Sequence, residues 1–128
     1  MNISFNDNVP IYIQIINGIK KDICIGNLKG GDRLPSVREL SQELKVNQNT
    51  IQRAYQELER EGYSFTQRGI GTFIIEDDEI LNNTKIDMAT KEVEYFITAM
   101  LELGFNKQQI INIVSKKLEG DDILWDQI

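Results

Sequence analysis

Hydrophobic residues recur at intervals of three and four over residues 8–26, which predicts a long amphipathic helix. Asp7 or Asn8 can cap its start, Pro10 is tolerated in a first turn, and Gly26 can end it. Its apolar stripe, which we expect to face a core, consists of Tyr12, Ile15, Ile16, Ile19 and Ile23.

Two shorter helical patterns follow, joined by a short connector. Ser36 and Glu39 have the spacing of a capping box, and Pro35 disfavours an earlier helix start. Asn47 can cap the next helix, which Gly62 ends. The positions expected to be buried are Val37, Leu40, Leu44, Ile51, Ala54, Tyr55 and Leu58. The polar outer face of the second helix carries Gln48, Asn49, Gln52, Arg53 and Gln56.

That outer face has the side chains that read base edges. Asn and Gln pair with adenine, and Arg pairs with guanine or phosphate, in a major groove that is wide enough for a helix. Two helices with a tight turn between them and such a face on the second are typical of a helix-turn-helix. A simple solvated helix face is the alternative interpretation.

Residues 63–75 have the pattern of a β-hairpin. Tyr63 and Phe65 alternate with Ser64 and Thr66, as in a strand whose apolar side faces a core. The turn over residues 67–71 places Arg68 at the tip, where it could enter a narrow minor groove or bind a phosphate. Gly69 and Gly71 would let the backbone approach DNA closely, although an ordinary hairpin with a solvated Arg remains the alternative.

The C-terminal part begins with an acidic stretch, residues 76–87, that we expect to be a linker. Helical spacing then resumes from Met88 to Gly104, and a second helix follows the capping pair Asn106 and Gln109. Apolar positions cover more than one side of these helices, which favours a symmetric dimer over a monomer folded back on itself. The candidate dimer contacts are Phe96, Met100, Ile110, Ile113, Val114 and Trp125.

Charge is distributed unevenly along the chain. The 128 residues carry a formal net charge of −6. Residues 1–75 hold nine Lys and Arg against eight Asp and Glu, whereas residues 76–128 hold five against twelve. A nearly neutral DNA-binding head implies modest non-specific affinity, so binding would depend on two heads acting together.

Several classes of function are disfavoured by what the sequence lacks. It has no His, the usual general base and a common metal ligand, and its acidic run lacks the alternation of a calcium loop. Its one cysteine, Cys24, cannot form an internal disulfide. No apolar run is long enough to span a membrane and no secretory signal is evident, so we expect a cytoplasmic protein without a cofactor or enzymatic activity.

The segments LPSVREL, VNQNTIQRAYQELEREGY and RGIGTF carry a family resemblance. With the upstream segment VPIYIQIINGIKKDICIGNLKGGDRLPS, they resemble the DNA-binding domain of GntR-family bacterial transcription regulators over residues 8–76. By that resemblance, Arg38 matches an Arg that contacts DNA, Asn49 and Thr50 match the start of the recognition helix, and Gly71 matches the wing glycine that enters the minor groove.

One position departs from the family pattern. Many members carry Arg where this chain has Gln52, and the Arg here is Arg53, so Arg53 could read bases or grip phosphate. The candidate DNA-binding residues are Arg33, Ser36, Arg38, Gln48, Asn49, Thr50, Gln52, Arg53, Arg68, Gly69 and Gly71.

The short C-terminal part resembles the YtrA-type branch of the family, which implies a two-helix dimerisation segment and a transporter operon as the target. The fold class expected is mostly α with a small β-hairpin wing. It comprises a winged helix-turn-helix domain (1–76), an acidic linker (77–87) and a two-helix dimerisation segment that forms a helical hairpin (88–128).

The function expected is a cytoplasmic, homodimeric, sequence-specific repressor on double-stranded DNA with a palindromic operator. Two alternatives stay open. The chain could be a protein-interaction module with a winged-helix shape. It could also be a sensor with a small-molecule effector at the dimer seam near Phe96, Met100 or Trp125.

Overall fold

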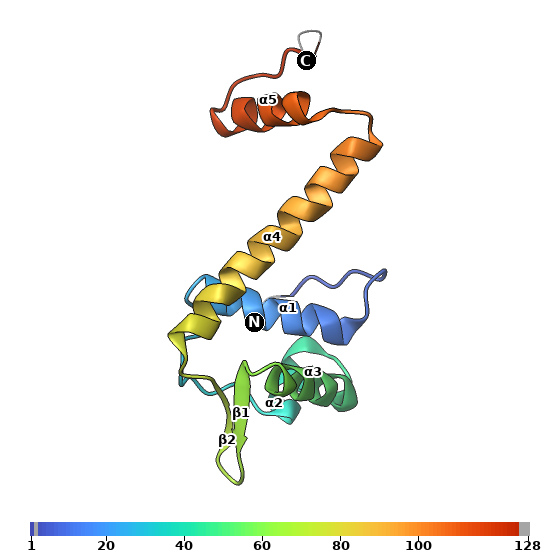
Figure 1. Cartoon of the computed structure of the whole chain (residues 1–128). Helices are drawn as coiled ribbons and strands as arrows, with labels where there is room; N and C mark the ends of the chain where they lie inside the picture. Colours follow the sequence, from blue (N-terminus) through green and yellow to red (C-terminus); the bar gives the residue numbers. More distant parts are fainter. Residues whose placement is uncertain (2, 126–128) are drawn as a thin grey trace. The chain divides into compact units, whose positions relative to one another are not determined.

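The computed structural model describes residues 1 and 3–125, which form five helices and one two-stranded hairpin (Figure 1). Their order is α1 (Ile11–Cys24), α2 (Val37–Leu44), α3 (Gln48–Arg60), β1 (Ser64–Gln67), β2 (Gly71–Ile74), α4 (Asp78–Glu102) and α5 (Lys107–Leu118). The chain divides into two compact units, Met1–Ile86 and Asp87–Ile128. The predicted fold class, mostly α with a β-hairpin wing, is confirmed.

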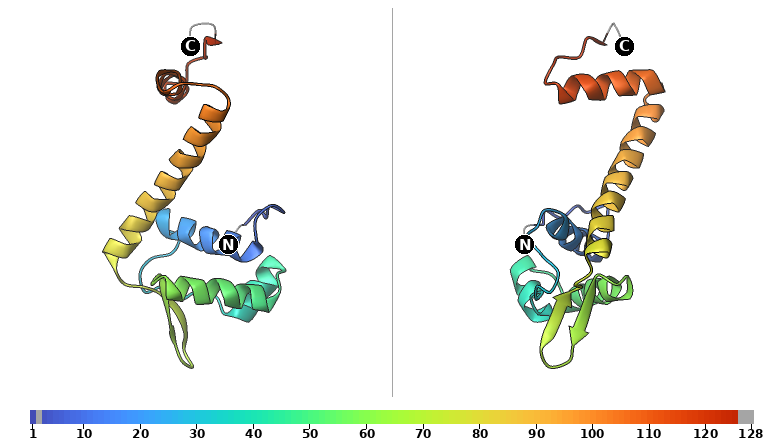
Figure 2. Two further views of the ribbon diagram at one scale, coloured as in Figure 1. Left: turned by 45° about the vertical axis from the view of Figure 1, so that its right-hand side comes forward. Right: turned by 60° about the vertical axis from the view of Figure 1, so that its left-hand side comes forward.

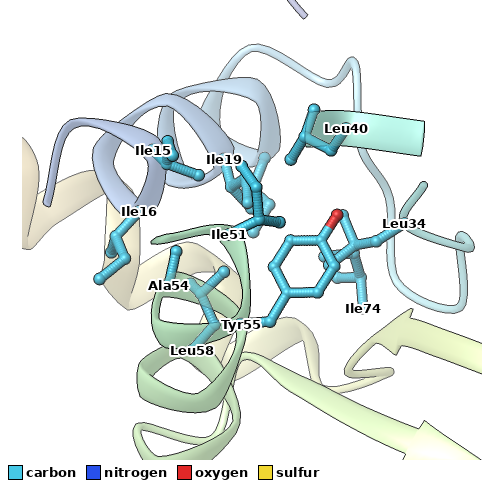
Figure 3. Close-up of a cluster of buried hydrophobic side chains, with 11 residues drawn as sticks. Ile15, Ile16, Ile19, Leu34, Leu40, Ile51, Ala54, Tyr55, Leu58 and Ile74 are labelled. Carbon is cyan, nitrogen blue, oxygen red and sulfur yellow. The ribbon is translucent and has the colours of Figure 1, made fainter. Parts of the chain in front are cut away.

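The core of the first unit lies between α1, α2, α3 and β2 (Figure 3). The apolar stripes predicted for these three helices supply most of it. The fully buried side chains include Ile15 and Ile19 of α1, Leu40 of α2, Ile51, Ala54 and Leu58 of α3, and Ile74 of β2. Because fully burying one such aliphatic side chain contributes about 1.5–3 kcal/mol, this face of α3 cannot turn outward without a large loss of stability.

A hydrogen bond ties α3 to the turn in front of α2. The Tyr55 hydroxyl donates to the carbonyl oxygen of Pro35 at 2.6 Å, and the ring belongs to the same buried cluster as Leu34 and Ile74 (Figure 3). The connector between α2 and α3 is closed by Lys45, which adopts the left-handed conformation, and by Asn47, which caps α3 through the Asn49 amide. The two helices are therefore held at both ends of their contact.

The start of α1 differs from the prediction. The helix begins at Ile11, and its N-cap residue is Pro10, so the predicted cap by Asp7 or Asn8 is wrong. The Gln14 side chain donates to the carbonyl oxygens of Asn6 and Val9, both at 2.7 Å, and accepts from the Asn6 amide. These hydrogen bonds hold the segment before α1 in a turn conformation, so the helix does not extend into it.

Tyr63, just before β1, packs against the core as predicted, but within the hairpin strands the buried face is the opposite of the predicted one. Ser64 is buried, whereas Phe65 is 39% exposed and stacks on Phe73 with the ring centroids 5.7 Å apart. The cause is the register, which pairs Ser64 with Ile74. Because directly paired residues lie on the same side of a sheet, the buried Ile74 commits Ser64 to the core and both aromatic rings to the outer side.

The predicted acidic linker is helical, so its description as a link between elements is wrong. α4 already begins at Asp78, and the Asp77 carboxylate accepts from the amides of Glu79 and Ile80. Acidic residues stabilise the first turn of a helix because they face its positive end. Leu81 packs against the core and Thr84 is buried, so the first turns of α4 belong to the first unit.

The predicted signals around α5 are confirmed. Asn106 and Gln109 form a full capping box, with both reciprocal hydrogen bonds present. Gly104 and Gly120 follow α4 and α5 with positive φ, as expected at helix ends. Over the described part of the chain, no helix is long and apolar enough to cross a membrane.

The buried Tyr55 predicts a specific loss of stability at high pH. Burial, and next the charges of Glu39 and Glu43, raise the pKa of Tyr55 above its ordinary value of 10.0. The folded phenol therefore keeps its proton where an unfolded one loses it, so its contribution is complete below pH 10 and decreases above it.

Urea denaturation at pH 8.5 and 10.5 measures this contribution. From one tyrosine we expect a decrease of about 0.8 kcal/mol in the free energy of unfolding at the higher pH. The Tyr55→Phe variant, which cannot ionise there, should lack this part of the decrease. An equal decrease in both proteins would contradict the prediction.

Candidate nucleic-acid interface

The outer face of α3 is exposed along its first two turns. Its inner face is fixed by the core, so Gln48, Asn49 and Gln52 are left in solvent. Thr50 is half-buried at the edge of this face. Two hollows flank the helix, one toward the hairpin and one toward α1, and they bring most of the predicted DNA-binding residues together.

The wing-side hollow lies between α3, the start of α2 and the hairpin, and has a volume of about 390 Å³. The predicted residues that line it are Arg33, Ser36, Gln52, Gly69 and Gly71. They come from distant parts of the sequence. The hairpin extends beyond the three helices of this unit (Figure 2).

Arg33 and Gly71 lie in close contact beside the turn of the hairpin. Arg33 forms an isolated β-bridge with Phe73, and a side-chain carbon at Gly71 would stand 2.8 Å from its Nε atom. Gly71 also has a φ of +150°, which other residues rarely adopt. Glycine at this position therefore makes room for the Arg33 side chain.

Two predicted DNA-binding residues, Ser36 and Arg38, lie at the start of α2. Ser36 is the N-cap residue, and its hydroxyl accepts from the Glu39 amide at 3.0 Å. Arg38 is exposed in the first turn. Ser36 thus caps the start of α2, whereas Arg38 is exposed to solvent and is not among the residues that line the hollow.

The α1-side hollow has a volume of about 420 Å³ and is lined by Ile11, Tyr12, Asn49, Thr50 and Arg53. The Arg53 guanidinium lies over the Tyr12 ring, with its central carbon 3.8 Å from the ring centroid. Sequence reasoning missed Tyr12 as part of this surface. Its helical spacing placed it on the buried stripe of α1, and the local sequence carries no signal of its contact with α3.

Ion pairs in the first unit neutralise acidic groups away from the candidate surface. Glu57 accepts from Arg60 at 2.7 Å, which lowers the pKa of its carboxyl group, and Glu61 pairs with Lys20 at 3.0 Å. Among the described residues, Arg33, Arg38, Arg53 and Arg68 take part in no ion pair of this kind. These four arginines lie before or in α2, in α3 and in the hairpin turn, so the candidate surface carries guanidinium groups that none of these ion pairs holds.

The sequence of the first unit decides the family. The model of the family described as bacterial regulatory proteins, gntR family, matches residues 11–74. The chain belongs to the GntR family. It is therefore a DNA-binding transcription regulator and not an enzyme.

Relatives in this family match most of the chain. The HTH-type transcriptional regulator YhcF of Bacillus subtilis is 42% identical over 120 residues, covering 94% of this chain and 99% of the relative. The HTH-type transcriptional repressor YtrA of the same organism is 44% identical over 91 residues, or 70% of each protein. The expected likeness to YtrA is thus confirmed.

Solved structures of GntR regulators also match. A family member from Listeria monocytogenes superposes with a TM-score of 0.81 at 45% identity, covering 88% of this chain and 98% of the other. The DNA-binding domain of AraR, solved in complex with an operator, matches 58% of this chain and 93% of its own, with a TM-score of 0.50 and 26% identity.

The candidate dimer contacts lie in the second unit of this GntR regulator with unequal exposure. Phe96 and Trp125 are exposed, and Met100 and Val114 are half-buried. Ile110 and Ile113 are buried within the chain itself. The exposed side chains can contact a partner directly. The two buried isoleucines can affect such a contact only through the side chains that pack on them.

Arg68 at the wing tip generates a test of the candidate interface. Replacing Arg68 by Ala should lower the dependence of DNA affinity on salt, because one guanidinium fewer releases counterions. The slope of log K against log salt should decrease by about 0.9 for each phosphate that the variant no longer neutralises. Fluorescence anisotropy on a duplex selected by the wild-type protein from random DNA measures this slope.

Arg60→Ala is the matched control for this measurement. Arg60 is an exposed Arg of the same unit, but Glu57 already holds its guanidinium. Its removal should leave the slope unchanged. Equal slopes for wild type and Arg68→Ala would exclude Arg68 from the DNA contact.

Proposed function

We propose that this GntR regulator is a homodimeric repressor that binds a palindromic operator with its two recognition surfaces. Bacterial DNA lies in the cytoplasm, so the protein would act there. The proposal has three parts beyond DNA binding itself: a second copy of the chain as the partner, a two-fold operator, and repression as the outcome.

The small core of the second unit carries the dimer proposal. Among its described residues, the buried hydrophobic side chains are Ile110 and Ile113. The exposed large hydrophobic residues of the same unit are Val93, Tyr95, Phe96, Ile97, Leu101, Leu103, Ile111, Leu118, Leu124 and Trp125. Monomers seldom expose so many apolar residues in so short a segment, and a unit of this size gains stability by burying them against a partner.

A second copy of the chain fits the spacing along α4. Val93, Phe96, Ile97 and Met100 follow one another at the intervals that place side chains on one face of a helix. The same intervals form the seam when two helices of equal sequence pack together. A two-fold axis through such a seam would use the same residues from both chains.

Two-fold symmetry then predicts the operator. Two recognition helices related by a dyad read inverted half-sites about one helical turn, or 10 base pairs, apart. The head itself carries nearly equal numbers of acidic and basic residues. Joining two heads would compensate for weak single-site binding, because the second binding event becomes intramolecular.

Repression and the target operon are supported only by the similarity of this chain to YtrA and the YtrA-type branch. The Bacillus subtilis relative YtrA is named a transcriptional repressor, and this chain covers 70% of it. The transporter operon follows from the resemblance to the YtrA-type branch. A reporter fused to the chain's own promoter tests repression, and higher expression on deletion of the gene is the expected result.

Selection from random DNA tests the palindrome. The proposal predicts that the wild-type protein enriches an inverted repeat. It also predicts that a duplex with one half-site scrambled binds at least about 100-fold more weakly, the loss expected when avidity disappears. Enrichment of a single, asymmetric site would contradict the two-headed model. Failure to enrich any sequence would favour the protein-interaction alternative.

Ile97→Glu tests the dimer, with Tyr95→Glu as its control. Ile97 lies on the proposed seam, whereas Tyr95 is 76% exposed and lies two residues away, on the far side of α4. Sedimentation at micromolar concentration should show a dimer for wild type and Tyr95→Glu and a monomer for Ile97→Glu. A monomeric wild-type protein would contradict the proposal.

The effector hypothesis stays a prediction of the sequence. Trp125 is the single tryptophan of the chain and is exposed in the second unit. Its fluorescence would therefore report a ligand that binds beside it.

A further inference from the structure

The contact between Arg53 and Tyr12 joins the recognition helix to another helix of the first unit. Tyr12 lies in the first turn of α1 and Arg53 in the second turn of α3. The guanidinium carbon stands 3.8 Å from the ring centroid, well within the range of a cation–π contact. Glu57, one turn along α3, makes its direct ion pair with Arg60 at 2.7 Å, and Arg53 acts on that carboxylate only as a nearby charge.

This contact draws Arg53 to one flank of α3. Gln52 and Gln56 line the wing-side hollow, whereas Thr50 and Arg53 line the hollow beside α1. Asn49 lines the α1-side hollow as well but is exposed to solvent. The first two turns of α3 therefore place the Gln52 amide on the wing side and the Arg53 guanidinium on the α1 side, and the Asn49 amide is exposed to solvent.

The flanks of a recognition helix face the two sugar-phosphate backbones. A helix with its side chains is about 10–12 Å across, and the major groove is about 12 Å wide, so little room is left beside it. A side chain held on the flank reaches the groove wall, while the outermost residues reach the base edges. The positive end of the α1 dipole also adjoins Tyr12 and adds to the attraction for an anion there.

We infer that Tyr12 is a positioning residue that holds Arg53 as a phosphate clamp, and that Arg53 does not read bases. A guanidinium that lies over a ring face can still donate from its in-plane N–H groups, and these are the groups that bind a phosphate. Holding the side chain before binding also removes the entropy cost of ordering it on DNA. This inference rests on the DNA-binding function of the chain.

Anisotropy titrations on the duplex selected by the wild-type protein, and on its single-base variants, test the inference. Arg53→Ala should weaken binding by the same factor on every duplex. It should also decrease the slope of log K against log salt by about 0.9 for each head that is bound. A change in preference at any base pair would show that Arg53 reads bases and would overturn the phosphate clamp.

The role of Tyr12 is tested by a double-mutant cycle. Tyr12→Leu should weaken binding about two- to fivefold for each head, which corresponds to an exposed cation–π contact, and should have no effect when Arg53 is already Ala. Tyr12→Phe keeps the ring and should bind like the wild type. Equal effects of Tyr12→Leu in both backgrounds would assign Tyr12 a merely structural role and overturn the positioning claim.

Arg53→Lys guards against a folding defect in Tyr12→Leu. Lysine keeps the positive charge but lacks the planar guanidinium group that stacks on the ring. If thermal melts show that Tyr12→Leu is unfolded, Arg53→Lys replaces it as the test, and we expect Arg53→Lys to bind more weakly than the wild type. Arg53→Lys binding as tightly as wild type would then overturn the inference. Absence of DNA binding by the wild-type protein would instead contradict the DNA-binding function.

Discussion

The burial of one face of α3 is the constraint on which the rest of the structure depends. Ile51, Ala54 and Leu58 are fully buried against the neighbouring elements, and α1 supplies the opposing isoleucines (Figure 3). Turning α3 by one residue would place Gln52 in that core, where an amide without partners is costly. The core therefore decides which side chains face outward, and those side chains are the amides and the arginine of the recognition surface.

Contacts from other elements then orient the surface around α3. Tyr55 binds the carbonyl group of Pro35 and so fixes the approach to α2. The close approach of Arg33 to Gly71 joins the segment before α2 to the hairpin. Together with the stacking of Arg53 on Tyr12, these contacts hold parts of three elements beside one helix. Each of them links residues that lie far apart in the sequence.

The distinction between local and distant contacts explains what the sequence could predict. Caps and helical spacing are local, so α2, α3 and α5, and the outer positions of the recognition helix, followed from them. The buried face of the hairpin could not be predicted from local sequence, because the pairing of Ile74 with Ser64 decides which face is buried. The acidic run was misread because Asp77 caps α4. Tyr12 was missed because its contact with Arg53 exists only once α1 and α3 pack.

The central claim is that the core-directed orientation of α3 places its outer face in the major groove. Dimethyl sulfate protection measures this directly, because the reagent attacks guanine N7 in the major groove and adenine N3 in the minor groove. On the selected duplex we expect protection of guanine N7 in two patches that lie about one helical turn apart. Bound protein that leaves every guanine N7 reactive would contradict the account.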